Sequence, residues 1–422
     1  MRISILLCIT TAGTVDAFQP TSSWTHHKKN RGSSIRLDAT TSSYSTSSRR
    51  EFVQSAATAA AATFAVGSSI VSPVVAVPDV ATASSSAAAS VAAIDLPPLG
   101  LGAWAWGDSF FWGYNPKEDA ELKQVFDYAI EQAPAAVTLL DTAELYGFGR
   151  SESLIGQFSQ DHDPSKVQVA TKFAALPFRT NADAVVKACQ ASYQRLGGQR
   201  PIDLYQIHFP NSFSNAEYWD GLARAYDQGL VKAVGVSNYG VDATRACHAA
   251  LAKRGIPLAT NQIQLSLLYR HPLNNGLLQC CQDLGVQVLS YSPLALGMLT
   301  GKYTADNLPK GPRKKVFEKL NASPEYHDLL ATMKTIAAAH GESVTLSQVA
   351  LNWARAKGTI PIPGARTLSQ VQKNYGALTW TLSPEEERVL DSASAKVSSF
   401  LQPSDNPFPK VDKDTGLIMY DS

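Results

Sequence analysis

The segment ValGlnValAlaThrLysPhe (167–173) and the segment Ala182–Leu196 that follows it are the part of the sequence from which the fold is predicted. The first segment is short and rich in β-branched and small apolar residues, as expected for a parallel strand buried on both faces. In the second segment, apolar residues recur at the spacing of one helix face. A strand followed by such a helix is one unit of a parallel α/β sheet.

The same unit recurs on both sides of this segment. The expected strands are Leu99–Trp104, Val137–Thr142, Val167–Phe173, Ile202–Phe209, Val231–Asn238, Pro257–Ile263, Val286–Ser292 and Thr359–Gly364. The expected helices are Glu118–Glu131, Ala182–Leu196, Ala216–Asp227, Val241–Lys253, Leu273–Leu284, Pro324–His340, Leu346–Ala356 and Leu382–Val397. Eight successive units of this kind predict closure into a (β/α)8 TIM barrel.

Length and composition fit one large domain behind an additional amino-terminal region. The chain has 422 residues, of which 45% are hydrophobic, and we expect the catalytic barrel to span residues 94–400. The interval before the last strand contains Leu296–Lys319, which is rich in Gly, Pro and Lys. We interpret this excursion and the tail at 401–422 as walls near the barrel mouth, because loops after barrel strands shape substrate pockets. Flexible linkers are the alternative.

Residues 1–93 differ in composition from the rest and predict a targeting region. Residues 1–17 have the short apolar core of a signal peptide, and residues 18–50 have the Ser-, Thr-, Lys- and Arg-rich composition of a transit peptide. Their junction resembles the bipartite plastid presequences of diatoms and related algae. Residues 51–93 are either a twin-arginine-type thylakoid signal or a low-complexity linker. We therefore expect an algal plastid location, in the stroma or the thylakoid lumen.

Charge and cysteine content exclude several classes of function. The formal net charge of +1 gives no electrostatic basis for binding nucleic acid or an anionic membrane surface, and no stable membrane insertion is predicted. Outside residues 1–17, the cysteines form no CxxC motif or Cys/His cluster with metal-ligand spacing. They are Cys189, Cys247, Cys280 and Cys281. We expect small buried residues, no metal site, and a monomer, since an isolated barrel needs no partner subunit.

Four ionisable residues stand where three consecutive predicted strands end. Asp141 and Tyr146 follow the second strand in LeuLeuAspThrAlaGluLeuTyrGly (139–147). Lys172 ends the third strand and His208 the fourth. A charge in an apolar strand is costly unless it is paired, and adjacent strands place Asp141 beside Lys172. Each residue alone has a structural explanation, but four at neighbouring strand ends indicate a catalytic site.

These side chains predict a site that donates a proton to a carbonyl group. A phenol ionises near pH ~10, so a neighbouring ammonium is expected to lower the pKa of Tyr146. Asp141 would hold Lys172 in place, and His208 would donate a hydrogen bond to the carbonyl oxygen. Tyr146 then supplies the proton while a hydride reaches the carbonyl carbon.

The motifs resemble the catalytic signatures of the aldo-keto reductase superfamily in order and spacing. The matching segments are LeuLeuAspThrAlaGluLeuTyrGly (139–147), AlaThrLysPhe (170–173) and GlnIleHisPhePro (206–210). The resemblance runs from about Leu99 to Leu382 and is strongest to plant and algal plastid members. It implies NADPH-dependent reduction of an aldehyde or ketone to an alcohol, with Asp141, Tyr146, Lys172 and His208 as catalytic residues.

The resemblance also implies where the nicotinamide half of the cofactor binds. The residues expected to bind cofactor on these strands are Gly102, Ser237, Asn238, Gln262, Tyr291 and Ser292. Of these, Ser237, Asn238 and Gln262 would bind the nicotinamide carboxamide, and Tyr291 would stack beneath the ring. The sequence has no GxGxxG fingerprint, so a separate dinucleotide-binding domain is not predicted.

The segment Ile360–Asn374 resembles the adenosine-phosphate site of the family. Arg366 is expected to clamp the 2′-phosphate of NADPH, since a guanidinium forms bidentate contacts with phosphate. Gln370 and Asn374 would face the adenine and ribose. Many relatives have a lysine and an arginine where this chain has Gly364 and Gln370. NADPH is therefore favoured, while weaker discrimination against NADH and a solvated Arg366 without a role stay open.

Aromatic residues crowd the first predicted loop and indicate an apolar substrate pocket. Trp104 and Phe209 are expected to contact the substrate, which points to apolar or aromatic carbonyl compounds without choosing among them. Two other functions fit the same residues. One is an NADPH-binding regulatory or sensor protein with little turnover, as in the potassium-channel β-subunits of the superfamily. The other is a lyase that uses Lys172 as a Schiff-base nucleophile.

Overall fold

The computed structural model describes residues 94–132, 135, 137–176, 178–211, 215–309 and 313–398, and the backbone at 410–411 and 418–419. The expected signal peptide (1–17), transit segment (18–50) and twin-arginine or linker segment (51–93) lie outside the described residues. So does the expected tail at 401–422, apart from two strands that pair antiparallel, β9 (Lys410–Val411) and β10 (Ile418–Met419).

Eight parallel strands form one sheet in the order of the sequence. They are β1 (Gly100–Gly102), β2 (Thr138–Asp141), β3 (Val167–Phe173), β4 (Ile202–Ile207), β5 (Val231–Ser237), β6 (Leu258–Gln264), β7 (Gln287–Tyr291) and β8 (Ile360–Pro361). A parallel bridge between Gly102 and Gly364 joins the last strand region to the first. The sheet is therefore a nearly closed (β/α)8 barrel, and the predicted fold class is confirmed.

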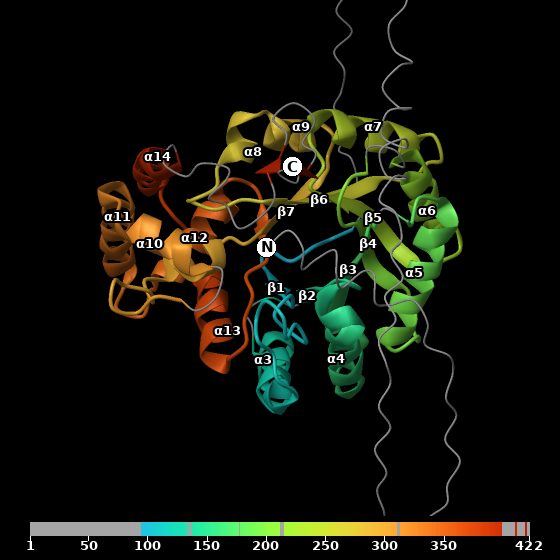
Figure 1. The fold of residues 1–422 in the computed structure, drawn as a ribbon, viewed down its shortest axis with the longest axis horizontal. Helices are drawn as coiled ribbons and strands as arrows, with labels where there is room; N and C mark the ends of the chain where they lie inside the picture. Colours follow the sequence, from blue (N-terminus) through green and yellow to red (C-terminus); the bar gives the residue numbers. More distant parts are fainter. Residues whose placement is uncertain are drawn as a thin grey trace, which may run out of the picture. The chain divides into compact units, whose positions relative to one another are not determined.

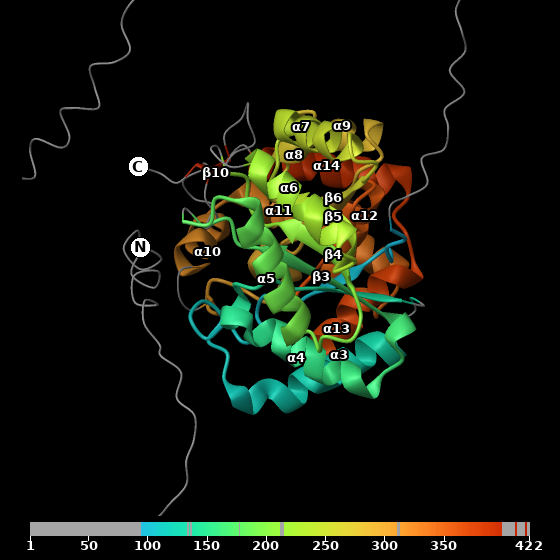
Figure 2. The ribbon, with the colours of Figure 1, turned by 90° about the vertical axis from the view of Figure 1, so that its right-hand side faces the viewer.

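Helices surround the sheet on its outside, as Figures 1 and 2 show. Those that follow the strands in turn are α3 (Asp119–Glu131), α4 (Arg150–Phe158), α5 (Ala182–Arg195), α6 (Asn215–Asp227), α7 (Val241–Ala252), α8 (His271–Asn274), α9 (Leu277–Asp283), α12 (Leu346–Ala356) and α13 (Leu368–Tyr375). Three further helices pack together beside α12 and share one apolar cluster. They are α10 (Arg313–Asn321), α11 (Pro324–His340) and α14 (Pro384–Ser398).

Alternate residues of the strands point into the barrel, and this alternation positions the site. Small and branched residues fill one layer of the interior: Leu139, Ala170, Leu204, Ala233, Ala259, Leu289, Ile360 and Ile362. Because successive strand residues face opposite sides, the inward residue two positions after Leu139 is Asp141, and two positions after Ala170 it is Lys172. The inner face therefore turns from apolar to charged at the carboxyl ends of the strands, where TIM-barrel active sites lie.

Two predicted segments differ from the structure. The helix predicted over Leu273–Leu284 is divided into α8 and α9, because Gly276 adopts a left-handed φ of 79° between them. The excursion Leu296–Lys319 is not a loop throughout, since its last part forms α10. Two residues of α10, Phe317 and Leu320, are fully buried in the cluster shared with α11. Burial of apolar side chains therefore orders a segment whose composition resembles that of a loop.

The sequence does not predict α4 and α13 as helices. Helix α4 buries Glu152 on its inner face, so its apolar pattern is incomplete. The Glu152 carboxylate is satisfied there by the Thr171 hydroxyl at 2.6 Å and by Nε of Arg195 at 2.6 Å. Helix α13 has only eight residues, too few to show a clear helical period.

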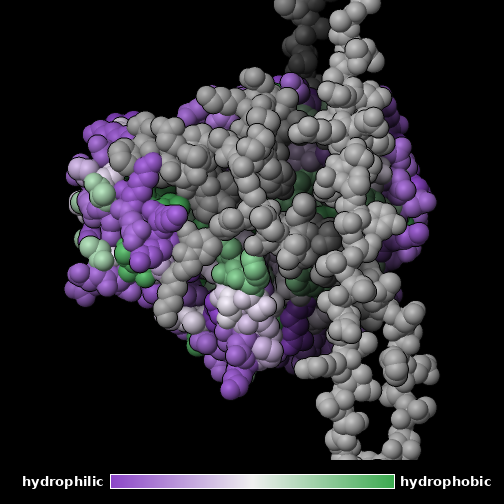
Figure 3. All heavy atoms as spheres, viewed as in Figure 1, coloured by the Kyte–Doolittle hydropathy of each residue, from purple (hydrophilic) through white to green (hydrophobic). Residues whose placement is uncertain are grey.

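The visible outer faces of the helices are largely hydrophilic at the margins of Figure 3, with hydrophobic patches nearer its centre. The four barrel cysteines are free thiols, and they are buried, as predicted. Within the described ranges, no helix is long and apolar enough to cross a membrane. The same ranges contain no group of three or more His, Cys, Asp or Glu that could hold a metal ion.

Candidate active site

A buried ion pair between neighbouring strands lies at the centre of the site. Nζ of Lys172 is 2.7 Å from Oδ2 of Asp141, and the same ammonium donates to the carbonyl oxygen of Thr142 at 2.7 Å. The Lys172 side chain is fully buried and that of Asp141 nearly so. Burial lowers the pKa of Lys172, and the charge of Asp141 opposes that shift. The expected pairing of the two residues is present.

An amide from across the barrel holds the other oxygen of Asp141. Nε2 of Gln262, on β6, donates to Oδ1 of Asp141, on β2, at 2.6 Å. Oε1 of Gln262 accepts no hydrogen bond from the described residues, so one acceptor remains beside the ion pair. The sequence assigns Gln262 to the cofactor alone, and no local pattern connects it to Asp141.

Tyr146 is brought to Lys172 by a tight turn after β2. The turn is a 3₁₀ segment, η2 (Tyr146–Gly149), in which Gly147 has a left-handed φ of 57°. A Cβ atom on Gly147 would overlap the backbone of Gly107, so this position needs glycine. Nζ of Lys172 lies 5.1 Å from the centroid of the Tyr146 ring. The first loop of the barrel therefore helps to set the position of the phenol.

The imidazole of His208 meets the phenol of Tyr146 edge to face, with ring centroids 5.8 Å apart and planes at 78°. The His208 ring also stacks on Phe209 at 4.3 Å. Nδ1 of His208 is buried and has no hydrogen-bond partner in the described part of the chain. Burial, together with the charge of Lys172, lowers the pKa of His208 well below its ordinary value. The ring is therefore neutral at pH 7 and keeps one N–H donor.

The predicted lowering of the Tyr146 pKa is wrong in direction. Burial, followed by the negative charge of Asp141, raises the pKa of Tyr146 well above its ordinary value. The positive charge of Lys172 does not reverse this shift because Asp141 largely compensates it at 2.7 Å. Tyr146 is therefore a protonated phenol throughout the neutral pH range.

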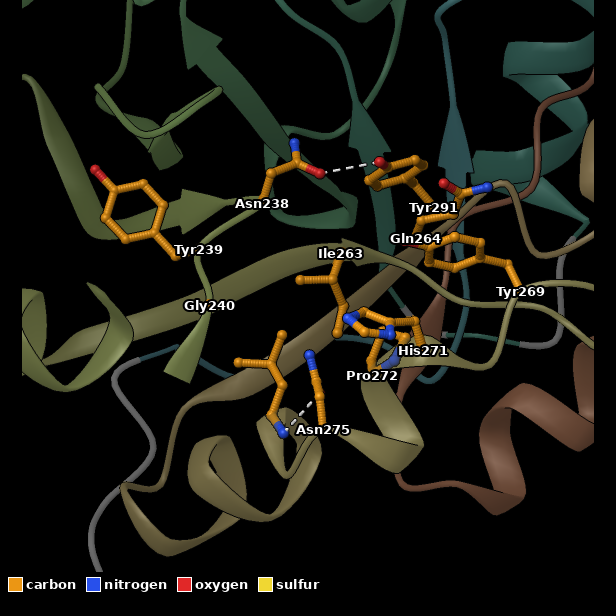
Figure 4. Close-up of a pocket in the computed structure, with 11 residues that line it drawn as sticks. Asn238, Tyr239, Gly240, Ile263, Gln264, Tyr269, His271, Pro272, Asn275 and Tyr291 are labelled. Carbon is orange, nitrogen blue, oxygen red and sulfur yellow. Dashed lines mark hydrogen bonds between the residues drawn. The ribbon is translucent and has the colours of Figure 1, made fainter. Parts of the chain in front are cut away.

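The expected nicotinamide-binding residues form a connected group at the ends of β5, β6 and β7. Oγ of Ser237 donates to the carbonyl oxygen of Gln262 at 2.8 Å, and Nδ2 of Asn238 donates to that of His208 at 3.1 Å. The Tyr291 hydroxyl donates to Oδ1 of Asn238 at 2.9 Å, the bond drawn in Figure 4. Asn238 has a left-handed φ of 61°, which asparagine tolerates better than most residues.

A hollow borders this group, between the loops after β5 and β6 and helix α8 (Figure 4). Its lining includes Asn238, Tyr269, His271, Asn275 and Tyr291. The hollow has about 340 Å³ of space, its open mouth included. Because Asn238 and Tyr291 form part of its wall, it belongs to the surroundings of the expected nicotinamide site.

The two other expected cofactor residues in this half also lie at strand ends. Gly102 ends β1, and a Cβ atom there would be 3.0 Å from the carbonyl oxygen of Ile362, so the closure of the barrel accounts for this glycine. Ser292 follows β7 with a left-handed φ of 49°. The Ser292 side chain forms no hydrogen bond with the described residues.

Of the expected adenosine-phosphate residues, Gln370 and Asn374 lie on α13, and Arg366 lies in the loop before it, where its side chain is not free. Nε and Nη2 of Arg366 both donate to Oε2 of Glu118, and Nη1 donates to the carbonyl oxygen of Trp112 at 2.8 Å. Gln370 accepts the Arg366 backbone N–H at 2.8 Å, and Asn374 donates to the loop backbone at 3.3 Å. The sequence offers no signal for Glu118, whose motif predicts only a helix start.

Aromatic rings line the first loop beside Tyr146. Trp104 stacks on Phe111 with centroids 5.0 Å apart, and it lies 6.2 Å from the Tyr146 ring. Trp112 packs edge-on against Trp104 at 5.4 Å and is covered by the Arg313 guanidinium at 5.0 Å. The excursion that contains Arg313 therefore reaches the mouth of the barrel, as predicted. The two expected substrate residues therefore lie beside the expected catalytic residues, Trp104 beside Tyr146 and Phe209 beside His208.

Comparisons with known proteins match most of the barrel to one family. The model of the aldo/keto reductase family matches residues 98–395. The chain is 41% identical over 318 residues to a chloroplastic pyridoxal reductase of Arabidopsis thaliana, covering 71% of this chain and 84% of the relative. It is 36% identical over 302 residues to an uncharacterized oxidoreductase of Mycobacterium tuberculosis, covering 70% of this chain and 88% of the relative.

Solved structures show the same architecture. A glycerol dehydrogenase from Gluconobacter oxydans is 28% identical with a TM-score of 0.63, covering 74% of this chain and 96% of the other. An aldo-keto reductase from Klebsiella pneumoniae in complex with NADPH is 25% identical with a TM-score of 0.54, covering 70% of this chain and 90% of the other.

Proposed function

This chain belongs to the aldo/keto reductase family and is an NADP-dependent oxidoreductase, and we propose that it reduces an aldehyde or ketone with Tyr146 as the proton donor. One observation carries the proposal. The Lys172–Asp141 pair lies beneath a phenol and an imidazole that contact each other at the mouth of the barrel. A structural ion pair alone needs neither of these two rings.

The reaction converts a carbonyl group into an alcohol. NADPH, when bound, supplies the hydride that reaches the carbonyl carbon. Tyr146 transfers its proton to the carbonyl oxygen, and the phenolate that remains is stabilised by the Lys172 ammonium until it regains a proton from water. Because the pKa of Tyr146 is raised, this transfer needs a basic, polarised oxygen. His208 donates a hydrogen bond to that oxygen from its neutral ring.

The described residues fit a nicotinamide cofactor. The bond from Nε2 of Gln262 to Asp141 fixes the orientation of the amide, so Oε1 is the atom left for a carboxamide N–H. Ser237 and Asn238 lie beside it, and the Tyr291 ring is held by its bond to Asn238. Arg366, at the start of α13, would take the 2′-phosphate of NADPH.

Aromatic aldehydes are the first class of substrate to test. The stacked rings of Trp104 and Phe111 stand beside Tyr146, and Phe209 stands beside His208, so a planar ring would be sandwiched while its carbonyl group reaches the phenol. A relative with 41% identity is named a pyridoxal reductase, so pyridoxal is the first compound to test.

That relative is chloroplastic, which supports the plastid location expected from residues 1–93. The monomeric state stays a prediction.

The test is the Tyr146→Phe variant of the full chain, followed by the loss of NADPH absorbance with pyridoxal, benzaldehyde and aliphatic aldehydes. We expect turnover to fall by about 10²–10⁴-fold, because the general acid is lost. The Kd of NADPH, from protein fluorescence, should stay within about twofold, since no cofactor contact is removed. Full activity of the variant would show that another group donates the proton. A wild-type chain that binds NADPH but reduces no carbonyl would favour the sensor alternative.

A further inference from the structure

We propose that Glu118 is a specificity-determining residue that weakens the preference for NADPH over NADH, because it holds the Nε/Nη2 edge of Arg366 in an ion pair that competes with the 2′-phosphate for that edge. This inference rests on the proposed role of Arg366 at the 2′-phosphate. It goes beyond that role by naming a competing anion within the chain.

The contacts of Arg366 occupy the pair of donors on one edge of its guanidinium. The Nε/Nη2 edge of the guanidinium, which binds oxyanions in bidentate fashion, is directed at Oε2 of Glu118. The neighbouring Nη1 is taken by the carbonyl oxygen of Trp112 at 2.8 Å. A bidentate contact of the Nε/Nη2 edge with a 2′-phosphate therefore requires Arg366 to release Glu118.

Glu118 is anchored independently of Arg366. It is the last residue of η1 (Pro116–Glu118), and its Oε1 accepts the backbone N–H of Asn115 at 3.3 Å in a capping box. One carboxylate oxygen therefore caps the segment while the other faces the guanidinium. When Arg366 turns to a phosphate, the carboxylate is held close by, where it both competes for the guanidinium and repels the new anion.

The backbone of Arg366 is also fixed, so only its side chain has to move. Its N–H donates to Oε1 of Gln370 at 2.8 Å, and Thr367 caps the start of α13. The side chains of Arg366 and Glu118 are 28% and 27% exposed, so solvent can take over either group during the exchange. An ion pair that is partly exposed is weak enough for a phosphate to displace it. It is also strong enough to reduce the apparent affinity of the chain for NADPH.

The competition acts on one cofactor only. NADH carries a hydroxyl where NADPH carries the phosphate, so Arg366 can stay with Glu118 when NADH binds. The sequence 360–374 has one other cation, Lys373, in the last turn of α13, and Gly364 and Gln370 add none. Arg366 is therefore the cation whose release decides how strongly the phosphate is recognised.

The experiment measures the Kd of NADPH, NADH and 2′-AMP for the full chain and for Glu118→Gln. Glutamine keeps an oxygen for the capping box, so η1 should remain folded. We expect the Kd of NADPH and of 2′-AMP to fall by roughly three- to tenfold, as for loss of a partly exposed ion pair and a like charge. The Kd of NADH should stay within about twofold. The ratio of KM values for the two cofactors should shift in the same direction.

A matched control is Glu121→Gln, which removes an equal charge from the first turn of α3 at an exposed residue that is not a partner of Arg366. It should change each Kd by less than about twofold, since screened surface charges interact weakly. Arg366→Ala should weaken the binding of NADPH and leave that of NADH unaffected. Adding Glu118→Gln to Arg366→Ala should then lower the Kd of NADPH by a smaller factor than Glu118→Gln alone, because only the repulsion between like charges is left to remove.

The outcomes separate the two proposals. Suppose that Arg366→Ala weakens the binding of NADPH, while Glu118→Gln leaves that binding unchanged or also weakens it. The proposed competition by Glu118 would then be wrong, and the assignment of Arg366 to the 2′-phosphate would stand. An equal gain in NADPH and NADH affinity for Glu118→Gln would also overturn the competition, because the effect would not involve the phosphate. If Arg366→Ala leaves NADPH binding unchanged, Arg366 does not bind the 2′-phosphate and both assignments fall.

Discussion

Gly147 packs so closely on Gly107 that a Cβ atom added to Gly147 would overlap the Gly107 carbonyl group. The contact joins the turn that carries Tyr146 to the loop that carries the aromatic wall. It connects the position of Tyr146, the proposed proton donor, to the proposed substrate wall, although the two segments follow different strands.

We expect Gly147→Ala to reduce kcat/KM by at least about tenfold and to lower the Tm, because both the left-handed φ of 57° and the overlap oppose a side chain. The matched control is Gly113→Ala, in the loop after β1 that also contains Gly107. Gly113 has a left-handed φ of 65° but no atom within 4 Å of an added Cβ, so it should cost stability without the loss of turnover. Equal losses of activity in both variants would contradict the packing argument.

Lys172→Met should abolish turnover and destabilise the fold by about 3–5 kcal/mol, because it leaves the Asp141 carboxylate buried without a counter-charge. Urea unfolding and aldehyde-dependent NADPH consumption measure the two effects. The double variant Asp141→Asn with Lys172→Met should recover part of the stability and none of the activity. A double variant no more stable than Lys172→Met would show that the loss does not come from the unpaired charge.

The lowered pKa of His208 predicts a pH dependence of stability. Below the ordinary histidine pKa of about 6.5, the unfolded chain binds a proton that the folded His208 does not bind. The free energy of unfolding should therefore fall as the pH decreases below about 6.5, by up to about 1.4 kcal/mol per pH unit from this residue. Urea titrations at several pH values should show a smaller slope for His208→Asn. Identical slopes would mean that His208 titrates normally in the folded chain.

Trp104→Ala should raise the KM for aromatic aldehydes by about tenfold, because an aromatic ring loses a stacking partner. The KM for a small aliphatic aldehyde should change little, since such a substrate has no ring to stack. Phe110→Ala serves as the control, since Phe110 belongs to the same loop but is 76% exposed. The control should alter neither KM. A similar loss with both aldehydes would indicate that Trp104 supports the loop and does not contact the substrate.

The sequence by itself determined the fold and the placement of the proposed catalytic residues at strand ends. Strand β3 and helix α12 have the predicted bounds, because the periods of two and of 3.6 residues are local properties of the chain. The same alternation places Asp141 and Lys172 on the inner face of neighbouring strands. The short helix α4 was not predicted, because the groups that form hydrogen bonds with its buried Glu152 lie on other elements.

Only the tertiary structure decided which distant residues meet. Gln262 bonds to Asp141 across 121 residues of sequence, and Arg366 pairs with Glu118 across 248. The sequence around each of these residues does not indicate its partner, because closure of the barrel determines which strand ends and loops face each other. The direction of the Tyr146 pKa shift was decided in the same way. It is the balance of burial against charges at particular distances, and a sequence contains neither the burial nor the distances.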